Sequence, residues 1–385
     1  MASYKMLDKG NWKVTISLGY DNTGKRRRVI KQGFRTKKLA EAFATQILDK
    51  KNHGFVSPTD SDLLFKNFIM KWYDMHTTSL KLSVNTRNDY LSRINTNLIP
   101  LLGNYKIKDI SIDVVQNFYN TLINEKHLKP TTVKKYLDIL SSCLKYAQSK
   151  DLIYKLPTSY IKKVKIQKPK IEYWNQEEVN FFLNYIKNTY LYTPIFIDIL
   201  TGLRIGELCG LRWCDVDLQN GIITVNHQLI HDKRLKVLLL ADLKTSSSHR
   251  SITIPKILID YLKELKANRQ ATNTEYVVLD RQDFKYIPRS LSMNFTKKVA
   301  KYKKSIDDFK KANEEVPHGY MQLKQISFHG LRHTHATLLI ANGENVKVVS
   351  ERLGHTDIRM TLNTYTHVLD SMKNNTANLL NNIFK

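Results

Sequence analysis

The sequence predicts a mixed, mainly α-helical (α+β) fold made of three folded parts. Its 385 residues suffice for two or three domains at roughly 150 residues each. Apolar and polar residues alternate near the N-terminus, as in a half-buried strand, and apolar residues then recur at helical spacing as far as residue 154. We therefore expect a small sheet-plus-helix domain over 1–60, a four-helix domain over 61–155, a linker over 156–172, and a mostly helical domain with a small β-sheet and a C-terminal tail over 173–385.

The charge balance points to a polyanionic partner. The chain holds 61 Lys+Arg and 35 Asp+Glu, a formal net charge of +26, and its isoelectric point is about 9.7. With 42% hydrophobic residues it is too apolar to be a disordered basic tail. Nucleic acid is therefore the first candidate partner.

Nothing in the sequence predicts secretion or a membrane span. The three cysteines, Cys143, Cys209 and Cys214, form no disulfide framework, so we expect reduced thiols in a cytoplasmic protein. No apolar run approaches 18 residues, and the first twelve residues contain no signal-peptide core. We expect no membrane partner.

The first sixty residues predict a small sheet followed by one helix. Residues 12–18 alternate in polarity, a second strand is expected over 25–33, and residues 34–35 could begin a third. Thr36 can cap a helix that runs over about 37–51.

The predicted second strand lies in a cluster of eight basic residues, without an acidic one, between Thr23 and Lys38. A basic sheet of this kind can read a DNA groove. The alternative is a solvated basic hairpin. The candidates for DNA contact are Lys25, Arg26, Arg27, Arg28, Lys31 and Arg35.

Four stripes of apolar residues at helical spacing predict a small helical bundle. The stripes span residues 64–72, 83–94, 114–122 and 133–144. Asn85 or Thr86 could cap the second helix, Pro100 is expected to break it, and Pro130 marks the start of the fourth. The aromatic residues of these stripes are expected in the core rather than as platforms for bases.

A lysine-rich segment separates this bundle from the last domain. Residues 155–170 contain six lysines, two prolines and no acid, a composition typical of an inter-domain linker. It could cross a phosphate backbone through Lys162, Lys163 and Lys165, or be an ordinary solvated charge run.

The last domain begins with a helix-capping pattern, Asn175 followed three residues later by Glu178. Short strands are expected over 221–225, 235–240 and 250–254, among helices that continue to the C-terminus. An apolar stripe at the end of the tail could dock on a neighbouring protomer or on its own domain. No role is predicted for Tyr302–Gln325.

Four short islands in the last domain carry residues suited to phosphate chemistry. They are Thr201–Leu208 (TGLRIGEL), Leu243–Arg250 (LKTSSSHR), Phe328–Thr337 (FHGLRHTHAT) and Leu353–His355 (LGH), with Tyr365–His367 (YTH) ten residues after the last. Any one of them alone is a weak signal.

Together, the islands resemble those of the tyrosine recombinases, the phage-integrase family, in residue type, order and spacing. The resemblance runs from Asn175 to about Val368. The helical domain before it resembles the family's core-site-binding domain. The N-terminal sheet and helix resemble the arm-binding domain of integrases from temperate phages and integrative conjugative elements.

The resemblance implies a catalytic set for DNA strand cleavage. Tyr365 would attack phosphorus and leave a 3′-phosphotyrosyl enzyme, and Lys244, on a hairpin turn, would be the general acid for the 5′-oxygen. His329 would accept a proton or donate to the phosphate, and His355 would donate to another phosphate oxygen. The full set is Arg204, Lys244, His329, Arg332, His355 and Tyr365.

The chemistry supports these roles independently of the resemblance. Cleaving a phosphodiester requires a nucleophile, charge neutralisation and an acid for the departing oxygen. Arg204 and Arg332 offer planar forks for the non-bridging oxygens, and His329 lies one helical turn before Arg332. A free tyrosine titrates near a pKa of ~10, so the cationic cluster is expected to favour the phenolate of Tyr365.

Structural roles are the alternative for each residue alone: Arg204 could cap a helix and Arg332 could join a surface ion pair. Glu207 is expected to hold an arginine, and His333 to be structural. His335 and His367 suggest no role, and only its distance from the Leu-Gly-His island selects Tyr365 among 20 tyrosines.

Metal chemistry is the rival interpretation of the histidines, because His-x-x-x-His on a helix can hold zinc. No acidic residue completes a His-Glu-x-x-His arrangement, and Arg332, between His329 and His333, would repel a cation. The covalent intermediate preserves the bond energy of the phosphodiester. We therefore expect no metal and no cofactor.

The sequence thus predicts a site-specific integrase that cuts and rejoins two DNA duplexes through a Holliday junction. Its expected partners are double-stranded DNA at core and arm attachment sites, three further copies in a homotetramer, and an excisionase or a host DNA-bending protein. The alternatives are a Xer-like chromosome or plasmid dimer resolvase, a catalytically silent DNA-binding regulator and a type IB topoisomerase. The basic N-terminal domain argues against the resolvase, and the intact catalytic set against the regulator.

Overall fold

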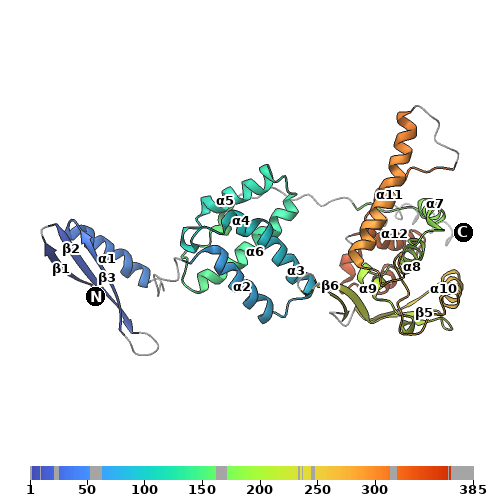
Figure 1. Cartoon of the computed structure of the whole chain (residues 1–385), viewed down its shortest axis with the longest axis horizontal. Coiled ribbons are helices and arrows are strands. Elements are labelled where there is room, and N and C mark those ends of the chain that lie inside the picture. Colours follow the sequence, from blue (N-terminus) through green and yellow to red (C-terminus); the bar gives the residue numbers. More distant parts are fainter. Residues whose placement is uncertain are drawn as a thin grey trace, which may run out of the picture. The chain divides into compact units, whose positions relative to one another are not determined.

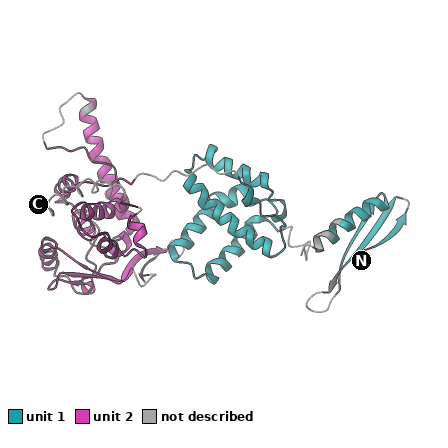
Figure 2. Ribbon diagram, turned by 180° about the vertical axis from the view of Figure 1, so that it is seen from behind, with its two compact units in different colours: residues 1–167 teal, residues 168–385 magenta. Residues whose placement is uncertain are grey.

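The computed structural model divides into two compact units, Met1–Gln167 and Lys168–Lys385 (Figure 2). It describes residues 2–8, 10–20, 26–52, 63–161, 171–232, 235, 237–243, 248–312, 319–362 and 364–365. These residues form a mainly helical protein with small antiparallel sheets, as the sequence predicts. None of the described helices has the length and apolar character needed to span a membrane.

A three-stranded antiparallel sheet opens the first unit, with one helix on it (blue in Figure 1). In sheet order its strands are β1 (Ala2–Asp8), β2 (Asn11–Tyr20) and β3 (Arg26–Phe34), and the helix is α1 (Lys37–Asn52). Val14 and Ile16 of β2 are fully buried against small residues of α1. The Thr36 hydroxyl accepts a hydrogen bond from Leu39 N–H at 3.3 Å, which confirms the predicted cap.

Two details of this sheet differ from the sequence expectation. Strand β1 was not expected, although apolar and polar residues alternate from Ala2 to Met6 and Ala2 and Tyr4 pack against the core of this sheet. The short third strand expected at residues 34–35 is wrong, since Phe34 is the last residue of β3.

Four helices follow, as predicted, and three of them have buried apolar faces, while α3 packs partly buried residues against the core. They are α2 (Phe65–Ser79), α3 (Val84–Arg93), α5 (Ile112–Asn120) and α6 (Pro130–Ser149). Shorter helical segments complete the bundle: η2 (Ile94–Leu98), α4 (Ile99–Leu102), η3 (Ile107–Asp109) and η4 (Thr121–Glu125). Trp72, Leu98 and Leu140 are at most 1% exposed and anchor its core.

Helix α3 differs from the prediction at both ends. Ser83, rather than Asn85 or Thr86, caps it, and its hydroxyl accepts a hydrogen bond from Thr86 N–H at 3.3 Å. Pro100 does not end the helical run, because it lies in the first turn of α4, where a missing N–H is tolerated. The run ends at Gly103.

The predicted linker begins as packed chain. Residues Pro157–Tyr160 form the 3-10 turn η5, and both Pro157 and Ile161 are buried. The Thr158 hydroxyl lies 3.0 Å from the Ser141 hydroxyl of α6. Residues 162–170, which include Lys162, Lys163 and Lys165, lie outside the described residues.

The second unit combines helices with two small antiparallel sheets (Figure 1). Its helices are α7 (Gln176–Ile186), α8 (Tyr192–Thr201), α9 (Ile205–Gly210), η6 (Trp213–Asp215), α10 (Lys256–Arg269), α11 (Pro288–Lys311), α12 (Phe328–Ala341) and α13 (Val346–Leu353). One sheet has the order β4 (Val216–Asp217), β5 (Ile222–Val225), β8 (Arg250–Thr253), and the other pairs β6 (His227–Asp232) with β7 (Val237–Asp242). The sequence pattern predicts β5, β7 and β8 but neither β4 nor β6.

The start of α7 confirms the predicted capping pattern. The Asn175 side chain accepts from Glu178 N–H at 2.8 Å, and the Glu178 carboxylate accepts from Asn175 N–H at 2.8 Å. Trp174, Phe182 and Phe295 are fully buried just behind this helix start.

Tight packing between α8 and α12 positions the catalytic candidates. Gly202 ends α8 in the left-handed region at φ 66°, and a Cβ there would lie 2.6 Å from the His335 ring. Only glycine fits this approach. It lets the chain turn and place Arg204 two residues later at the start of α9.

The stretch Tyr302–Gln325 continues α11 and returns to the body of the unit. The Tyr302 hydroxyl donates to Met321 O at 2.7 Å and accepts from Met321 N–H at 2.9 Å. Tyr302 is 1% exposed, so these two hydrogen bonds fix the chain at Met321 to the core of the second unit.

Candidate active site

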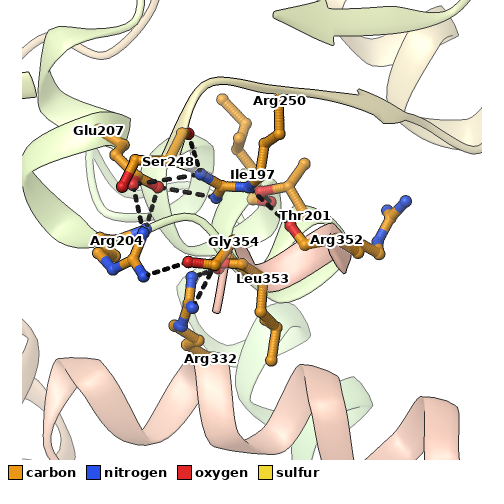
Figure 3. Close-up of polar contacts among 11 residues, drawn as sticks. Ile197, Thr201, Arg204, Glu207, Ser248, Arg250, Arg332, Arg352, Leu353 and Gly354 are labelled. Atoms are coloured by element: carbon orange, nitrogen blue, oxygen red, sulfur yellow. Dashed lines mark hydrogen bonds and ion pairs between the residues drawn. The ribbon is translucent and has the colours of Figure 1, made fainter. Parts of the chain in front are cut away.

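Two arginines from distant segments meet at the carbonyls just before His355. Arg204 Nη2 donates to Gly354 O at 2.9 Å, and Arg332 Nη2 donates to Leu353 O at 2.5 Å. The donors come from the start of α9 and from α12, and the acceptors from the end of α13 (Figure 3). Three of the predicted islands therefore converge at one place.

A buried carboxylate holds the first arginine and recruits another. Glu207, 3% exposed, accepts from Arg204 Nη1 at 2.8 Å and from Arg250 Nη2 at 2.8 Å (Figure 3). Burial opposes ionisation of Glu207, but the hydrogen bonds and charges of Arg250 and then Arg204 outweigh it and lower the pKa of this carboxyl. Glu207 therefore holds arginines, as the sequence predicts.

Arg332 lies deepest in the cluster, at 3% exposed. Its Nη1 donates to Gly202 O at 2.7 Å, in addition to its bond to Leu353 O. Burial and the charge of Arg204 lower the pKa of Arg332 to about 9, so the guanidinium remains charged at neutral pH. The alternative role considered for Arg332, in a surface ion pair, is excluded because the side chain is buried.

A carboxyl with no partner faces the same cluster from α8. Asp198 is 1% exposed, and neither of its carboxyl oxygens has a hydrogen-bond partner among the described residues. Burial raises the pKa of Asp198 well above its usual value, against the attraction of Arg332. The neutral acid is thereby favoured beside the buried guanidinium.

Two predicted histidines lie next to these arginines and are held neutral. His355 Nδ1 lies 2.7 Å from the hydroxyl of the fully buried Thr361, and burial together with Arg332 and Arg204 lowers the pKa of His355 to about 4. Desolvation, then the charges of Arg332 and Arg204, also lower the pKa of His329. Both imidazoles are thus available as neutral donors or acceptors.

A third histidine has a structural place that the sequence did not suggest. His335 Nε2 accepts from Arg352 Nε at 3.1 Å, so the other ring nitrogen must carry the proton that is donated to Ile199 O at 2.7 Å. Burial, with Arg352, lowers the pKa of His335 to about 3. This neutral ring and Arg352 link α8, α12 and α13.

Tyr365 is buried beside α12, with 2% of its surface exposed. Its hydroxyl lies 2.8 Å from Nδ1 of His333. Burial raises the pKa of the Tyr365 phenol, and Arg332 only partly opposes this. The expectation that the cationic cluster favours the phenolate is therefore wrong for this state, because desolvation outweighs the charge of Arg332.

Several predicted site residues cannot be placed. Lys244 lies outside the described residues, as do Lys25, the linker lysines and the C-terminal tail beyond Tyr365. Arg26 and Arg27 are placed by their backbone in β3 alone.

The described basic residues of β3 divide between the two faces of the N-terminal sheet. Arg28 pairs with Ser17 and is exposed on the open face. Lys31 pairs with Val14 on the face that α1 covers, and its Nζ lies 4.7 Å from the centre of the Phe43 ring. Arg35, just after β3, is exposed.

Arg250, Arg352 and Asp198 were not predicted from the sequence, and His333 was expected to be structural. Arg250 is the last residue of the Leu243–Arg250 island, and its place at the start of β8 is the signal that could have found it. The other contacts join segments far apart in the chain, so no local pattern marks them.

No group of three or more His, Cys, Asp or Glu side chains among the described residues could hold a metal ion. The histidines of α12 instead contact one another, a tyrosine and backbone, and the rings of His329 and His333 meet edge to face at 4.7 Å.

Comparison with known families agrees with this geometry. The phage integrase family model matches residues 172–372. The chain belongs to the phage integrase family. An arm DNA-binding domain matches residues 2–51, and the N-terminal SAM-like domain of phage integrases matches residues 64–123.

Curated relatives span nearly the whole chain. A XerC-like tyrosine recombinase of Caldanaerobacter subterraneus is 29% identical over 99% of this chain and 98% of its own. The ICEBs1 integrase of Bacillus subtilis is 24% identical over 99% of this chain and 100% of its own. The chain is thus a site-specific tyrosine recombinase, an enzyme of DNA integration and recombination in mobile elements and phages.

Solved structures share the fold. The Tn1549 transposon integrase, in complex with transposon right end DNA, has a TM-score of 0.64 at 22% identity and covers 81% of this chain and 99% of its own. A lambda integrase dimer bound to a COC′ core site has a TM-score of 0.56 at 16% identity and covers 94% of this chain and 93% of its own.

Proposed function

We propose that this recombinase integrates and excises a mobile element or phage genome through a 3′-phosphotyrosyl intermediate and a Holliday junction. The observation that carries the proposal is the convergence of Arg204 and Arg332 on the carbonyls of Leu353 and Gly354, next to His355. A site with two guanidiniums and neutral imidazoles suits a phosphodiester that gains charge in its transition state.

Arg204 is the guanidinium that meets the phosphate first, since its side chain is 38% exposed and Glu207 holds its orientation. Three of its five N–H donors remain for non-bridging oxygens after the bonds to Glu207 and Gly354. Arg332 adds a buried positive charge, and its attraction for the phosphate is stronger because water is excluded around it. His355 and His329 donate to the other phosphate oxygens.

Tyr365 is the nucleophile and Lys244 the general acid that protonates the 5′-oxygen. Attack forms the bond from Tyr365 Oη to phosphorus and releases the 5′-hydroxyl, and the reverse step rejoins a partner strand. Because Tyr365 is 2% exposed here, DNA docking must uncover its hydroxyl. Burial of this kind suits an enzyme that cuts only when assembled on its site.

Double-stranded DNA in the cytoplasm is the substrate, and four copies would assemble on paired core sites. We assign arm-site binding to residues 1–60, core-site binding to 61–155, a basic crossing to 156–172 and catalysis to 173–385. An excisionase or a DNA-bending protein would set direction. The exposed Arg28 supports the first assignment, since it can reach phosphates or base edges from the open face of the sheet.

Deleting residues 1–60 tests the integrase reading against a simple resolvase. A second DNA-binding domain on one chain raises the effective concentration of the attachment sites around the protein. Its loss is expected to weaken binding to full-length sites on the order of 10²-fold or more. Cleavage of an isolated core site should therefore stay within a few fold, whereas integration between full-length attachment sites should collapse. Gel assays of cleavage and two-site recombination, with footprints outside the core, measure both.

A point variant of the full chain controls for the deletion. Arg28→Ala on the open face should weaken arm-site footprints, and Lys37→Ala, an exposed cation on α1, should not. A truncated protein that integrates normally would contradict the arm-site assignment. Relaxation of single-site supercoils without recombination would instead favour the topoisomerase alternative.

A further inference from the structure

The hydroxyl of the proposed nucleophile already has a base beside it. Tyr365 Oη and His333 Nδ1 are 2.8 Å apart, and the two rings lie 5.9 Å between centres. His333 follows Arg332 in α12, so the phosphate-binding arginine and this imidazole move as one rigid element. Among the described residues, His333 rather than His329 is the hydrogen-bond partner of this hydroxyl.

The protonation states of the two groups allow the phenol to donate this hydrogen bond. Tyr365 packs among Ala336, Ile340, Val349 and Leu353, and burial raises the pKa of its phenol, so the hydroxyl keeps its proton. Desolvation, His329 and Arg332 lower the pKa of His333 to about 4. At neutral pH both groups are uncharged, and the tautomer of His333 that carries its proton on Nε2 accepts the hydrogen bond of the phenol at Nδ1.

The other groups of the arginine cluster are less suited to take the proton of this hydroxyl. Arg332 is a cation, Glu207 is occupied by two arginines, and Nδ1 of His355 is bonded to Thr361. We propose that His333 is the base that takes the proton of Tyr365 in the strand cleavage proposed above.

Strand cleavage then involves two proton transfers. As the bond from Tyr365 Oη to phosphorus forms, the phenol proton passes to His333 Nδ1. The bond from phosphorus to the 5′-oxygen breaks, and that oxygen takes its proton from Lys244. Rejoining reverses both transfers, and His333 returns the proton to Tyr365.

The charges around His333 make its basicity depend on bound DNA. The groups that face it are His329, Arg332, Tyr365 and, through the shared cluster, His355. In the free protein the cation and the buried setting oppose its protonation. A phosphodiester anion seated on Arg332 would offset that cation, so His333 becomes a better base when substrate is present.

His333→Asn separates proton transfer from hydrogen bonding, because an amide oxygen can accept the phenol bond but cannot take the proton. On a nicked suicide substrate, the full-length variant should bind DNA normally and form the covalent adduct about 10²–10⁴-fold more slowly. The wild-type rate should rise with pH only up to the pKa that His333 has in the DNA complex and then level off, since only neutral His333 can take the proton. The variant rate should rise with pH, because solvent must take the proton.

Chemical rescue and a matched variant complete the experiment. His333→Ala should regain adduct formation with added imidazole, a response that a purely structural role would not give. His127→Asn is the control, because His127 is exposed and its φ of 49° suits asparagine. It should behave as wild type.

The outcomes distinguish a failure of the role proposed for His333 from a failure of the proposed recombinase function. A wild-type adduct on Tyr365 with an unchanged rate and pH profile in His333→Asn overturns the proposed base alone. A pH-dependent defect in His329→Asn instead of His333→Asn moves the role to His329 and also overturns it. Failure of the wild-type protein to form any adduct overturns the proposed function as well.

Discussion

Arg332→Lys is expected to reduce strand cleavage at least about 10²–10³-fold, the usual loss when one donor to a developing oxyanion is removed. The guanidinium spans two carbonyls on different segments, Gly202 O at 2.7 Å and Leu353 O at 2.5 Å. A lysine ammonium is a point charge and cannot bridge both while also facing a phosphate. The measurement is the single-turnover rate of adduct formation on a core-site suicide substrate.

Arg269→Lys is the matched control for this variant. Arg269 also donates to a backbone carbonyl, Val277 O at 3.0 Å, but it lies outside the catalytic candidates. It should leave the cleavage rate within a few fold. Wild-type cleavage in Arg332→Lys would show that a positive charge alone is needed at this position. It would contradict a role for the two hydrogen bonds of Arg332 to Gly202 O and Leu353 O.

Glu207→Gln is expected to destabilise the second unit by about 3–5 kcal/mol, the range for removing one member of a buried ion pair. Most of this loss comes from Arg250, whose side chain is 6% exposed, because Arg204 at 38% is screened by solvent. Cleavage should fall as well, since Arg204 loses the carboxylate that orients it. Calorimetric unfolding of wild type and variant gives the difference.

The difference should depend on pH in a fixed direction. Because the pKa of Glu207 in the folded protein is below its ordinary value of 4.5, its stabilisation is complete above that value. It is lost as the pH falls through the folded pKa, where the variant and the wild type should converge. Asp260→Asn, at an exposed pair with Lys256, should shift stability by less than about 0.5 kcal/mol. A constant difference between pH 7 and pH 3 would contradict the ion-pair explanation.

Much of the fold and the main catalytic candidates could be predicted from the sequence. Periodicity gives the four helices of the first unit, and local capping chemistry marks Thr36 and Asn175. The common site of Arg204 and Arg332 was implied by the resemblance of the islands to those of the tyrosine recombinases.

The rest depends on contacts that no local pattern records. Glu207 and Arg250 are 43 residues apart, and His333 and Tyr365 are 32 apart. The ionisation of Tyr365 was predicted in the wrong direction because sequence shows the nearby cations but not the burial that outweighs them. Strand β1 was missed although its residues alternate in polarity from Ala2 to Met6.

The central claim is that Tyr365, although buried and protonated in this structure, is the residue that joins to DNA. Trapping wild-type protein on a nicked suicide substrate and sequencing the DNA-linked peptide by mass spectrometry tests it most directly. We expect the adduct on Tyr365, and we expect Tyr365→Phe to bind the same DNA without forming one. A linked peptide that carries another of the 20 tyrosines, or an adduct that persists in Tyr365→Phe, would contradict the account.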